Sequence, residues 1–157
     1  MSDKERGARV RFPPPLVFLT CVISGFAIQR TVMTVHYPVD RWLTIAVGLV
    51  VLLTGASLVA SARILFLRTR QNPVPWTPTP QLIFTGPYRF TRNPMYVGIT
   101  FVMIGIGLVR DNPWVSAFAV PALLVVHLIA VRPEETYLAT KFGDPYRAYL
   151  ARVRRYL

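Results

Sequence analysis

Residues 43–62 read LTIAVGLVVLLTGASLVASA, a stretch of 20 residues without a charged side chain. A helix of about 20 apolar residues crosses the roughly 30 Å hydrocarbon core of a bilayer, so this stretch predicts a membrane span. Three further apolar stretches surround it, which predicts an all-α, polytopic membrane protein with four transmembrane helices and a single membrane-embedded domain over residues 1–157. The predicted spans are residues 16–35, 43–62, 95–110 and 113–131.

The first span, residues 16–35, follows a basic segment and therefore also fits the layout of a secretory signal peptide. It begins directly after Pro13, Pro14 and Pro15, and no pair of small residues spaced for cleavage ends it. We therefore expect this stretch to be retained as a transmembrane helix.

The chain is basic and yet poor in charge, with 18 Lys+Arg against 7 Asp+Glu and only 16% charged residues. A soluble domain contains about 25% charged residues. Fifteen of the 18 basic residues precede the first span, lie between the second and third, or follow the fourth, whereas Arg30, Arg41 and Arg110 fall on the other side. The positive-inside rule then places both termini in the cytoplasm of a multi-pass protein of a bacterial inner membrane or an equivalent membrane.

This charge distribution also limits the possible functions. The basic residues are an orientation signal, so the expected partner is the lipid bilayer and no nucleic acid. All seven acidic residues lie outside the predicted spans, which disfavours an ion-coupled transporter with a buried carboxylate. The sequence also contains no metal-binding cluster, nucleophile triad or phosphate-binding loop.

Residues 71–94 and 132–157 form the predicted cytoplasmic region in which chemistry could take place. The first of these segments holds six of the 14 prolines, which predicts a stiff, irregular path. It is either an interfacial loop with aromatic anchors or a loop that folds back and walls a pocket. At its end, Asn93 and Pro94 predict a helix start, with Asn as the N-cap and an N-terminus open to an anion.

Glycines in the third span and acidic residues after the fourth are further candidates. Gly98 and Gly105 lie on one helical face, which favours close packing of a second helix or the approach of a ligand. Glu134 and Glu135 lie in a predicted first helical turn, where the helix dipole favours carboxylates. His127, seven residues before Glu134, is predicted to share its helical face and is either a functional group or a packed core histidine.

The segment 132–157 carries too many charges to span a bilayer. Its apolar positions predict two short interfacial helices, separated by a turn at Gly143, Asp144 and Pro145.

The combined pattern GPYRFTRNPMYVG at residues 86–98 and EETYLATKFGDPYRAYLARV at residues 134–153 resembles the isoprenylcysteine carboxyl methyltransferase and phospholipid methyltransferase families. The resemblance covers roughly residues 78–155. It implies a small membrane enzyme that transfers a methyl group from S-adenosylmethionine to a lipid, isoprenoid or other apolar acceptor at the cytoplasmic face. The cofactor-binding residues that it implies are Gln81, Leu82, Ile83, Tyr88, Asn93, Pro94, Met95, Tyr96, Glu134 and Glu135.

Two departures from the family pattern concern the chemistry. Asn93 replaces a histidine and cannot titrate, so an acid–base role at this position is not implied. Prenylcysteine enzymes of the family have an arginine that contacts the acceptor. The nearest match here is Arg132, at a different spacing from the Glu pair. Arg132 and His127 are therefore candidates, and no catalytic residue is assigned. The alternatives are a non-enzymatic membrane protein for transport or assembly, and a reductase of the same architecture.

Overall fold

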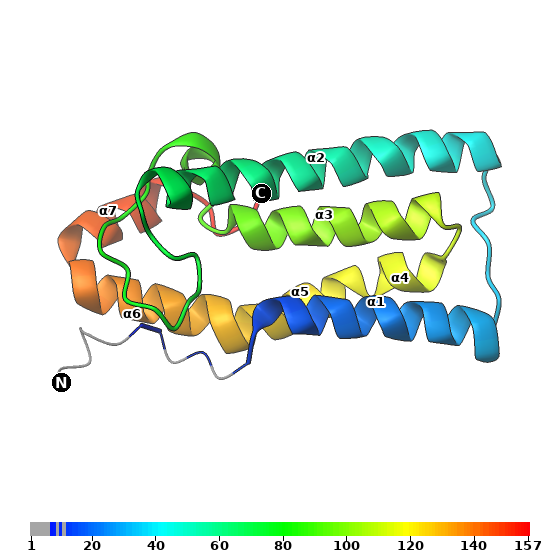
Figure 1. Ribbon diagram of the computed structural model, residues 1–157, viewed down its shortest axis with the longest axis horizontal. Coiled ribbons are helices and arrows are strands. Elements are labelled where there is room, and N and C mark those ends of the chain that lie inside the picture. The colour runs from blue at the N-terminus through cyan, green and yellow to red at the C-terminus, as the bar shows by residue number, and fades with distance from the viewer. Residues whose placement is uncertain (1–6, 9, 11) are drawn as a thin grey trace.

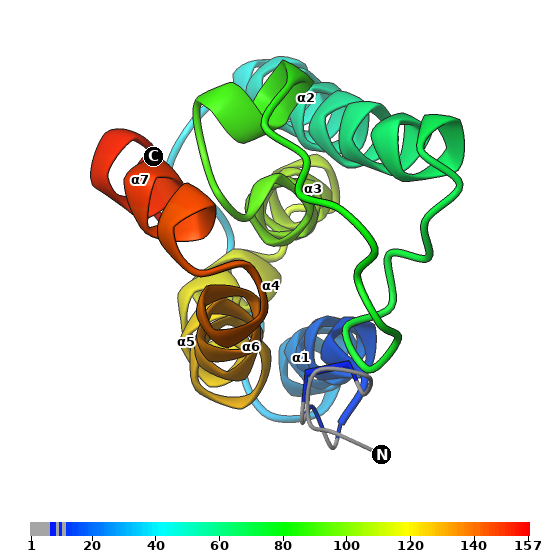
Figure 2. The ribbon, with the colours of Figure 1, turned by 90° about the vertical axis from the view of Figure 1, so that its left-hand side faces the viewer.

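The computed structural model describes Gly7, Ala8, Val10 and residues 12–157, and every regular element in this part of the chain is a helix. Four helical rods lie side by side along the longest axis, and a loop and a short helix gather at one end (Figures 1 and 2). The first three rods are α1 (Pro14–Thr31), α2 (Arg41–Arg68) and α3 (Pro94–Val109). The fourth consists of α4 (Pro113–Ala117), α5 (Ala119–Val126), η2 (His127–Val131) and α6 (Arg132–Phe142). The remaining elements are η1 (Gly86–Arg89) and α7 (Asp144–Arg152).

Helices α2 and α3 pack closely because glycines face each other across their interface. A Cβ atom added at Gly98 would lie 2.6 Å from Val59 Cγ2 and 2.8 Å from the Gly55 carbonyl oxygen. A Cβ atom at Gly105 would lie 2.6 Å from the backbone of Leu52. The helix-packing interpretation of Gly98 and Gly105 is thus confirmed, since small residues allow two helix backbones to approach.

The fourth rod is longer than predicted. It runs without interruption of the helical path from Pro113 to Phe142, over 30 residues, whereas the sequence predicted a span that ends at residue 131. Pro133 lacks the N–H group that would continue the α-helical hydrogen bonds, and the preceding turn η2 is a π-helix in which the Arg132 N–H bonds to the His127 carbonyl. The π-turn therefore allows the helix to continue through Pro133, and α6 extends the rod beyond its apolar part.

The prediction of four spanning helices is confirmed only in part, because two helices in the described part of the chain, α2 and the rod Pro113–Phe142, have the length and apolarity that a span requires. Helix α3 has 16 residues and is therefore about 24 Å long, shorter than the bilayer core of about 30 Å. Helix α1 ends at Thr31 and not at residue 35, because the Gln29 amide bonds both the N–H and the carbonyl of Val35 (3.2 and 2.7 Å) and turns the chain aside.

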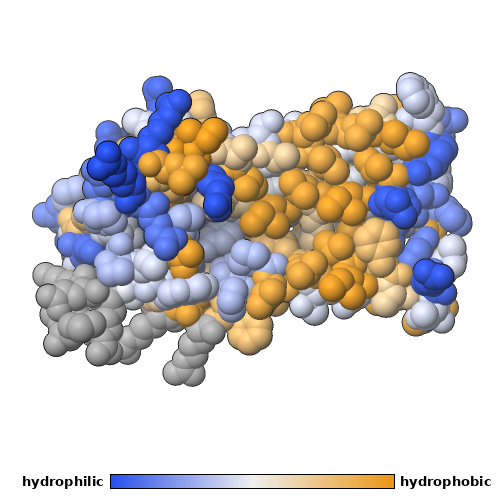
Figure 3. All heavy atoms as spheres, viewed as in Figure 1, coloured by the Kyte–Doolittle hydropathy of each residue, from blue (hydrophilic) through white to orange (hydrophobic). Residues whose placement is uncertain are grey.

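The surface of the rods indicates a membrane protein. Only 17% of the apolar window of α2 and 33% of that of the fourth rod are buried, so these helices are not the core of a soluble domain. A mainly hydrophobic surface separates two hydrophilic ends (Figure 3). Large apolar side chains are exposed on α1, α2 and α5, among them Leu19, Ile23, Val50, Leu53 and Leu124.

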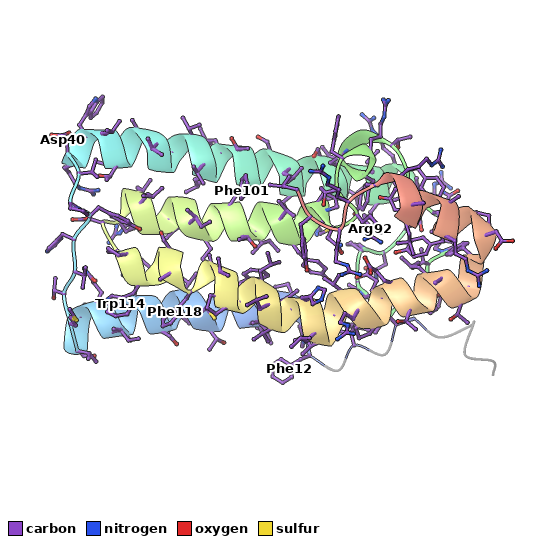
Figure 4. The ribbon with its side chains drawn as sticks, turned by 180° about the vertical axis from the view of Figure 1, so that it is seen from behind. Phe12, Asp40, Arg92, Phe101, Trp114 and Phe118 are labelled. Atoms are coloured by element: carbon purple, nitrogen blue, oxygen red, sulfur yellow. The ribbon has the colours of Figure 1, made fainter. Side chains whose placement is uncertain are left out.

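The two ends of the bundle separate the basic residues as the sequence predicted. Arg30, Arg41 and Arg110 lie at the ends of α1, α2 and α3 that face away from Arg92, which lies at the opposite end of the bundle (Figure 4). Which compartment each end faces stays a prediction. The basic residues expected before the first span lie outside the described residues: Lys4, Arg6, Arg9 and Arg11.

Candidate active site

A cavity of about 300 Å³ opens at the end of the bundle where the loop between α2 and α3, the start of α1 and helices α6 and α7 come together. Its size lies at the lower end of the range for small-molecule sites, about 300–1,000 Å³. Nine of the ten residues that the family resemblance implied line this cavity. These nine are Gln81, Leu82, Ile83, Tyr88, Asn93, Pro94, Met95, Tyr96 and Glu134.

The proline-rich loop forms one wall of the cavity, which confirms the second interpretation of residues 71–94. In the end-on view it leaves α2 and crosses over to α1 (Figure 2). The Ala8 N–H donates to the Pro75 carbonyl at 2.8 Å, and the Tyr137 hydroxyl accepts from the Thr79 N–H at 3.2 Å. These contacts bind a chain without regular structure to the N-terminal segment and to α6, so the loop is held in place as a wall.

Among the residues that the structure describes, Glu134 is the only carboxylate that lines this cavity. It lies in the first turn of α6, beyond the apolar part of the rod that ends at Val131, and the Tyr96 hydroxyl donates to its Oε2 at 3.5 Å. The Glu134 residue is only partly exposed, and the burial of its carboxyl group raises the pKa of Glu134 to about 7. The hydrogen bond from Tyr96 opposes the shift, and the nearby charge of Glu135 adds to it.

The side of the cavity near α7 is aromatic. The Tyr149 hydroxyl donates to the Tyr88 carbonyl at 2.7 Å, and the ring of Tyr149 lies 4.9 Å from the ring of Phe84 between centroids. Burial, and then the charge of Glu134, raise the pKa of Tyr88 well above its usual range, so its hydroxyl stays protonated. This side therefore offers flat apolar rings and neutral hydroxyl groups to a ligand.

The start of α3 also faces the cavity, but Asn93 does not cap it as predicted. No side-chain hydrogen bond from Asn93 caps the helix, and its Nδ2 donates to the Arg155 carbonyl at 3.0 Å instead. The C-terminal segment attracts this side chain because it runs beside residues 91–93, with a parallel bridge between Thr91 and Arg154. The first-turn N–H groups of α3, which have no partner within a helix, are thus left without an Asn cap.

Glu135 is the one implied residue that does not line the cavity. Its Oε2 accepts hydrogen bonds from Nε and Nη2 of Arg155 at 3.1 and 2.7 Å, and Arg92 Nη1 lies 3.2 Å from its Oε1, which also accepts from Arg155 Nε at 3.1 Å. The side chains of Glu135 and Arg92 are only 13% and 11% exposed. Through its ion pairs with Arg92 and Arg155, Glu135 therefore links α6 to the segment before α3 and to the C-terminal segment, behind the cavity.

Neither candidate catalytic residue lines the cavity. His127 Nδ1 lies 2.9 Å from the Tyr156 hydroxyl, and Arg132 is exposed. His127 and Glu134 were expected on one helical face, but only Glu134 lines the cavity. The π-turn His127–Val131 lies between them, and its extra residue rotates the following helix relative to a continuous α-helix.

Several lining residues were not identified from the sequence, notably Arg63 and Phe66 of α2, Trp76 of the loop, and Tyr146 and Tyr149 of α7. The two tyrosines belong to residues 134–153, the second stretch that carries the family resemblance, and this was a usable signal. Arg63 and Phe66 line the cavity because of how α2 and the loop pack together, and Trp76 belongs to the loop for which a pocket wall was one of the two interpretations.

Three comparisons relate the chain to known proteins. The sequence profile of the family described as "Phospholipid methyltransferase" matches residues 43–145. An uncharacterized protein of Haemophilus influenzae is 35% identical over 63 residues, which are 40% of this chain and all of that protein. The cobalt-zinc-cadmium resistance protein CzcN of Cupriavidus metallidurans is 27% identical over 93 residues, which are 57% of this chain and 40% of that protein. No solved structure matches.

Proposed function

Because the chain belongs to the phospholipid methyltransferase family, we propose that it transfers a methyl group from S-adenosylmethionine to a lipid, isoprenoid or other apolar acceptor at one face of a membrane. Family membership implies a methyltransferase, and the apolar helices agree with a membrane protein. The cofactor and the acceptor are our proposal. The observation that carries it is a carboxylate within an aromatic cavity at the hydrophilic end of the bundle.

The residues of the cavity fit S-adenosylmethionine. The cofactor carries a sulfonium and an ammonium group, and Glu134 supplies a negative charge that is costly while no cation is bound. Its raised pKa expresses that cost, and a bound cation would offset it. The free N–H groups at the start of α3 suit the carboxylate of the cofactor, and the rings of Tyr88, Tyr149 and Phe84 suit its adenine.

The sulfonium, when bound, supplies an activated methyl group for an in-line displacement. The protein then has to hold two reactants in line and exclude water, which is catalysis by positioning. Glu134, Tyr96 and the loop wall hold the cofactor side. Glu135 acts as a positioning residue, because its ion pairs with Arg92 and Arg155 fix the segment that leads into α3. We assign His127 and Arg132 no contact with the reacting atoms, because neither residue lines the cavity.

Calorimetry in detergent tests the proposal by measuring the affinity for S-adenosylmethionine in the wild type and in Glu134→Gln. We expect binding by the wild type and a clear loss of affinity in the variant, because the amide cannot balance a cation. Asp144→Asn is the matched control, since this carboxylate lies on the neighbouring α7 and its side chain is 91% exposed. Absence of binding by the wild type, or equal losses in the two variants, would contradict the proposal.

A further inference from the structure

The wall of the cavity carries a second cation besides Arg92, and it comes from α2. Arg92 is held by Glu135, whereas Arg63 has no carboxylate partner among the residues that the structure describes. Arg63 is exposed and lines the same cavity as Glu134 of α6, so the cavity has a negative group on one helix and a positive group on another. A ligand with an anionic group would complement this second position.

The surroundings of Arg63 are those of a membrane boundary. Arg63 lies near the end of α2, where the preceding Ala62 is fully buried and the following Ile64 is exposed. One turn further on, Leu67 is 64% exposed and the neighbouring Arg68 is exposed as well, so the outer face of the helix changes here from apolar to basic. An arginine at such a place can direct its guanidinium toward the polar end of the bundle while its stem covers apolar surface.

The cavity that Arg63 lines also has apolar walls. Phe66, from the next turn of α2, and Trp76, from the proline-rich loop, both line the cavity, as does Pro14 at the start of α1. The combination of one guanidinium and an apolar wall suits an amphiphile, with its charged head on the arginine and its chain against the aromatic rings. Guanidinium groups bind carboxylates and phosphates in a two-pronged geometry that a lysine does not reproduce.

We propose that Arg63 binds the anionic group, a carboxylate or a phosphate, of an amphiphilic methyl acceptor whose chain lies against Phe66 and Trp76. That this ligand is the acceptor rests on the proposed methyl transfer. The acceptor is favoured over the cofactor as the partner of Arg63 because the apolar side chains of Phe66 and Trp76 line the same cavity, while Glu134 and the first turn of α3 already provide for the charges of the cofactor.

The test measures binding without requiring turnover. Trp76 serves as the fluorescent reporter in a Trp42→Phe, Trp114→Phe background, since these two tryptophans lie at the far end of α2 and of the fourth rod. The purified protein in dodecyl maltoside is titrated with dibromostearate and, separately, with its uncharged methyl ester, both of which quench tryptophan. The affinity for S-adenosylmethionine is measured by calorimetry on the same samples.

We expect the carboxylate probe to quench at an about tenfold lower concentration than the ester, as one charge-assisted hydrogen bond allows. Arg63→Gln should abolish this preference without changing the affinity for the cofactor, and Arg63→Lys should retain part of it. Arg68→Gln is the control, because Arg68 is an exposed arginine of the same helix that does not line the cavity, and it should keep the full preference.

Three results would overturn the inference: no preference in the wild-type background, a preference that survives Arg63→Gln, or a loss confined to cofactor binding. The last result would assign Arg63 to the carboxylate of the cofactor. Failure of the wild type to bind S-adenosylmethionine would refute the proposed function, while the probe titrations would still decide whether Arg63 forms an anion site.

Discussion

The carboxyl group of Glu134 predicts how cofactor binding depends on pH. Its pKa of about 7 means that about nine-tenths of the free protein has the ionised form at pH 8 and about one-tenth at pH 6. If a cation binds only the ionised form, the apparent affinity is proportional to that fraction. The dissociation constant for S-adenosylmethionine should therefore rise about tenfold from pH 8 to pH 6.

Calorimetry at pH 6, 7 and 8 in the same detergent measures this dependence, with Glu134→Gln as the reference. The variant cannot titrate at this position, so any slope that it shows reports the cofactor's own amino group and is subtracted. The reasoning is refuted if the wild type and the variant have the same slope, or if the wild type binds more tightly at the lower pH.

The same pKa shift has the opposite effect on the stability of the ligand-free protein. A carboxyl whose pKa is higher in the folded than in the unfolded state binds more protons when folded, so its contribution to stability falls as the pH rises. This loss extends from the ordinary pKa near 4.5 to about 7. At pH 8 we therefore expect Glu134→Gln to have a higher midpoint of thermal unfolding than the wild type although it binds the cofactor more weakly. A lower midpoint would indicate that the amide damages the fold.

Three further variants test the packing around the cavity. Glu135→Ala leaves the nearly buried Arg92 without its partner and should lower the free energy of unfolding by about 2 kcal/mol or more, with faster carboxypeptidase digestion of the C-terminal segment; unchanged digestion would contradict the linking role. Tyr149→Phe removes the hydrogen bond to the Tyr88 carbonyl and should cost about 1 kcal/mol in thermal unfolding, so a neutral result would mean that the bond is not made in solution. Gly98→Leu places a side chain where a Cβ atom already meets α2 at 2.6 Å, and should cost about 3 kcal/mol or prevent folding, whereas a stable variant would disprove the close approach of the two helices.

Nine of the residues that line the candidate site were predicted through the family resemblance, whereas two boundaries of its helices were predicted from local chemistry. Asn93 before Pro94 predicted the start of α3, and Gly143 with Asp144 and Pro145 predicted the break between α6 and α7, where Gly143 has a φ of +61°. These features depend on the backbone preferences of a few adjacent residues. The extent of the rods was harder to predict, because the π-turn before Pro133 lets the helix pass a residue that normally ends one.

The sequence by itself determined the helical, membrane-type architecture, the division of the basic residues between two ends, and the family motifs of the site, since each of these is a property of residue type and spacing. Only the tertiary structure decided which of two adjacent carboxylates faces the cavity. Neighbouring residues on an α-helix point about 100° apart, so Glu134 and Glu135 must face different surroundings, and the packing of α6 decides which. Glu134 faces the cavity. Glu135 instead forms ion pairs with Arg92 and Arg155, because the C-terminal segment returns to that side of the helix. Arg63 joins the site for the same reason, since a loop without regular structure brings the end of α2 to the same cavity.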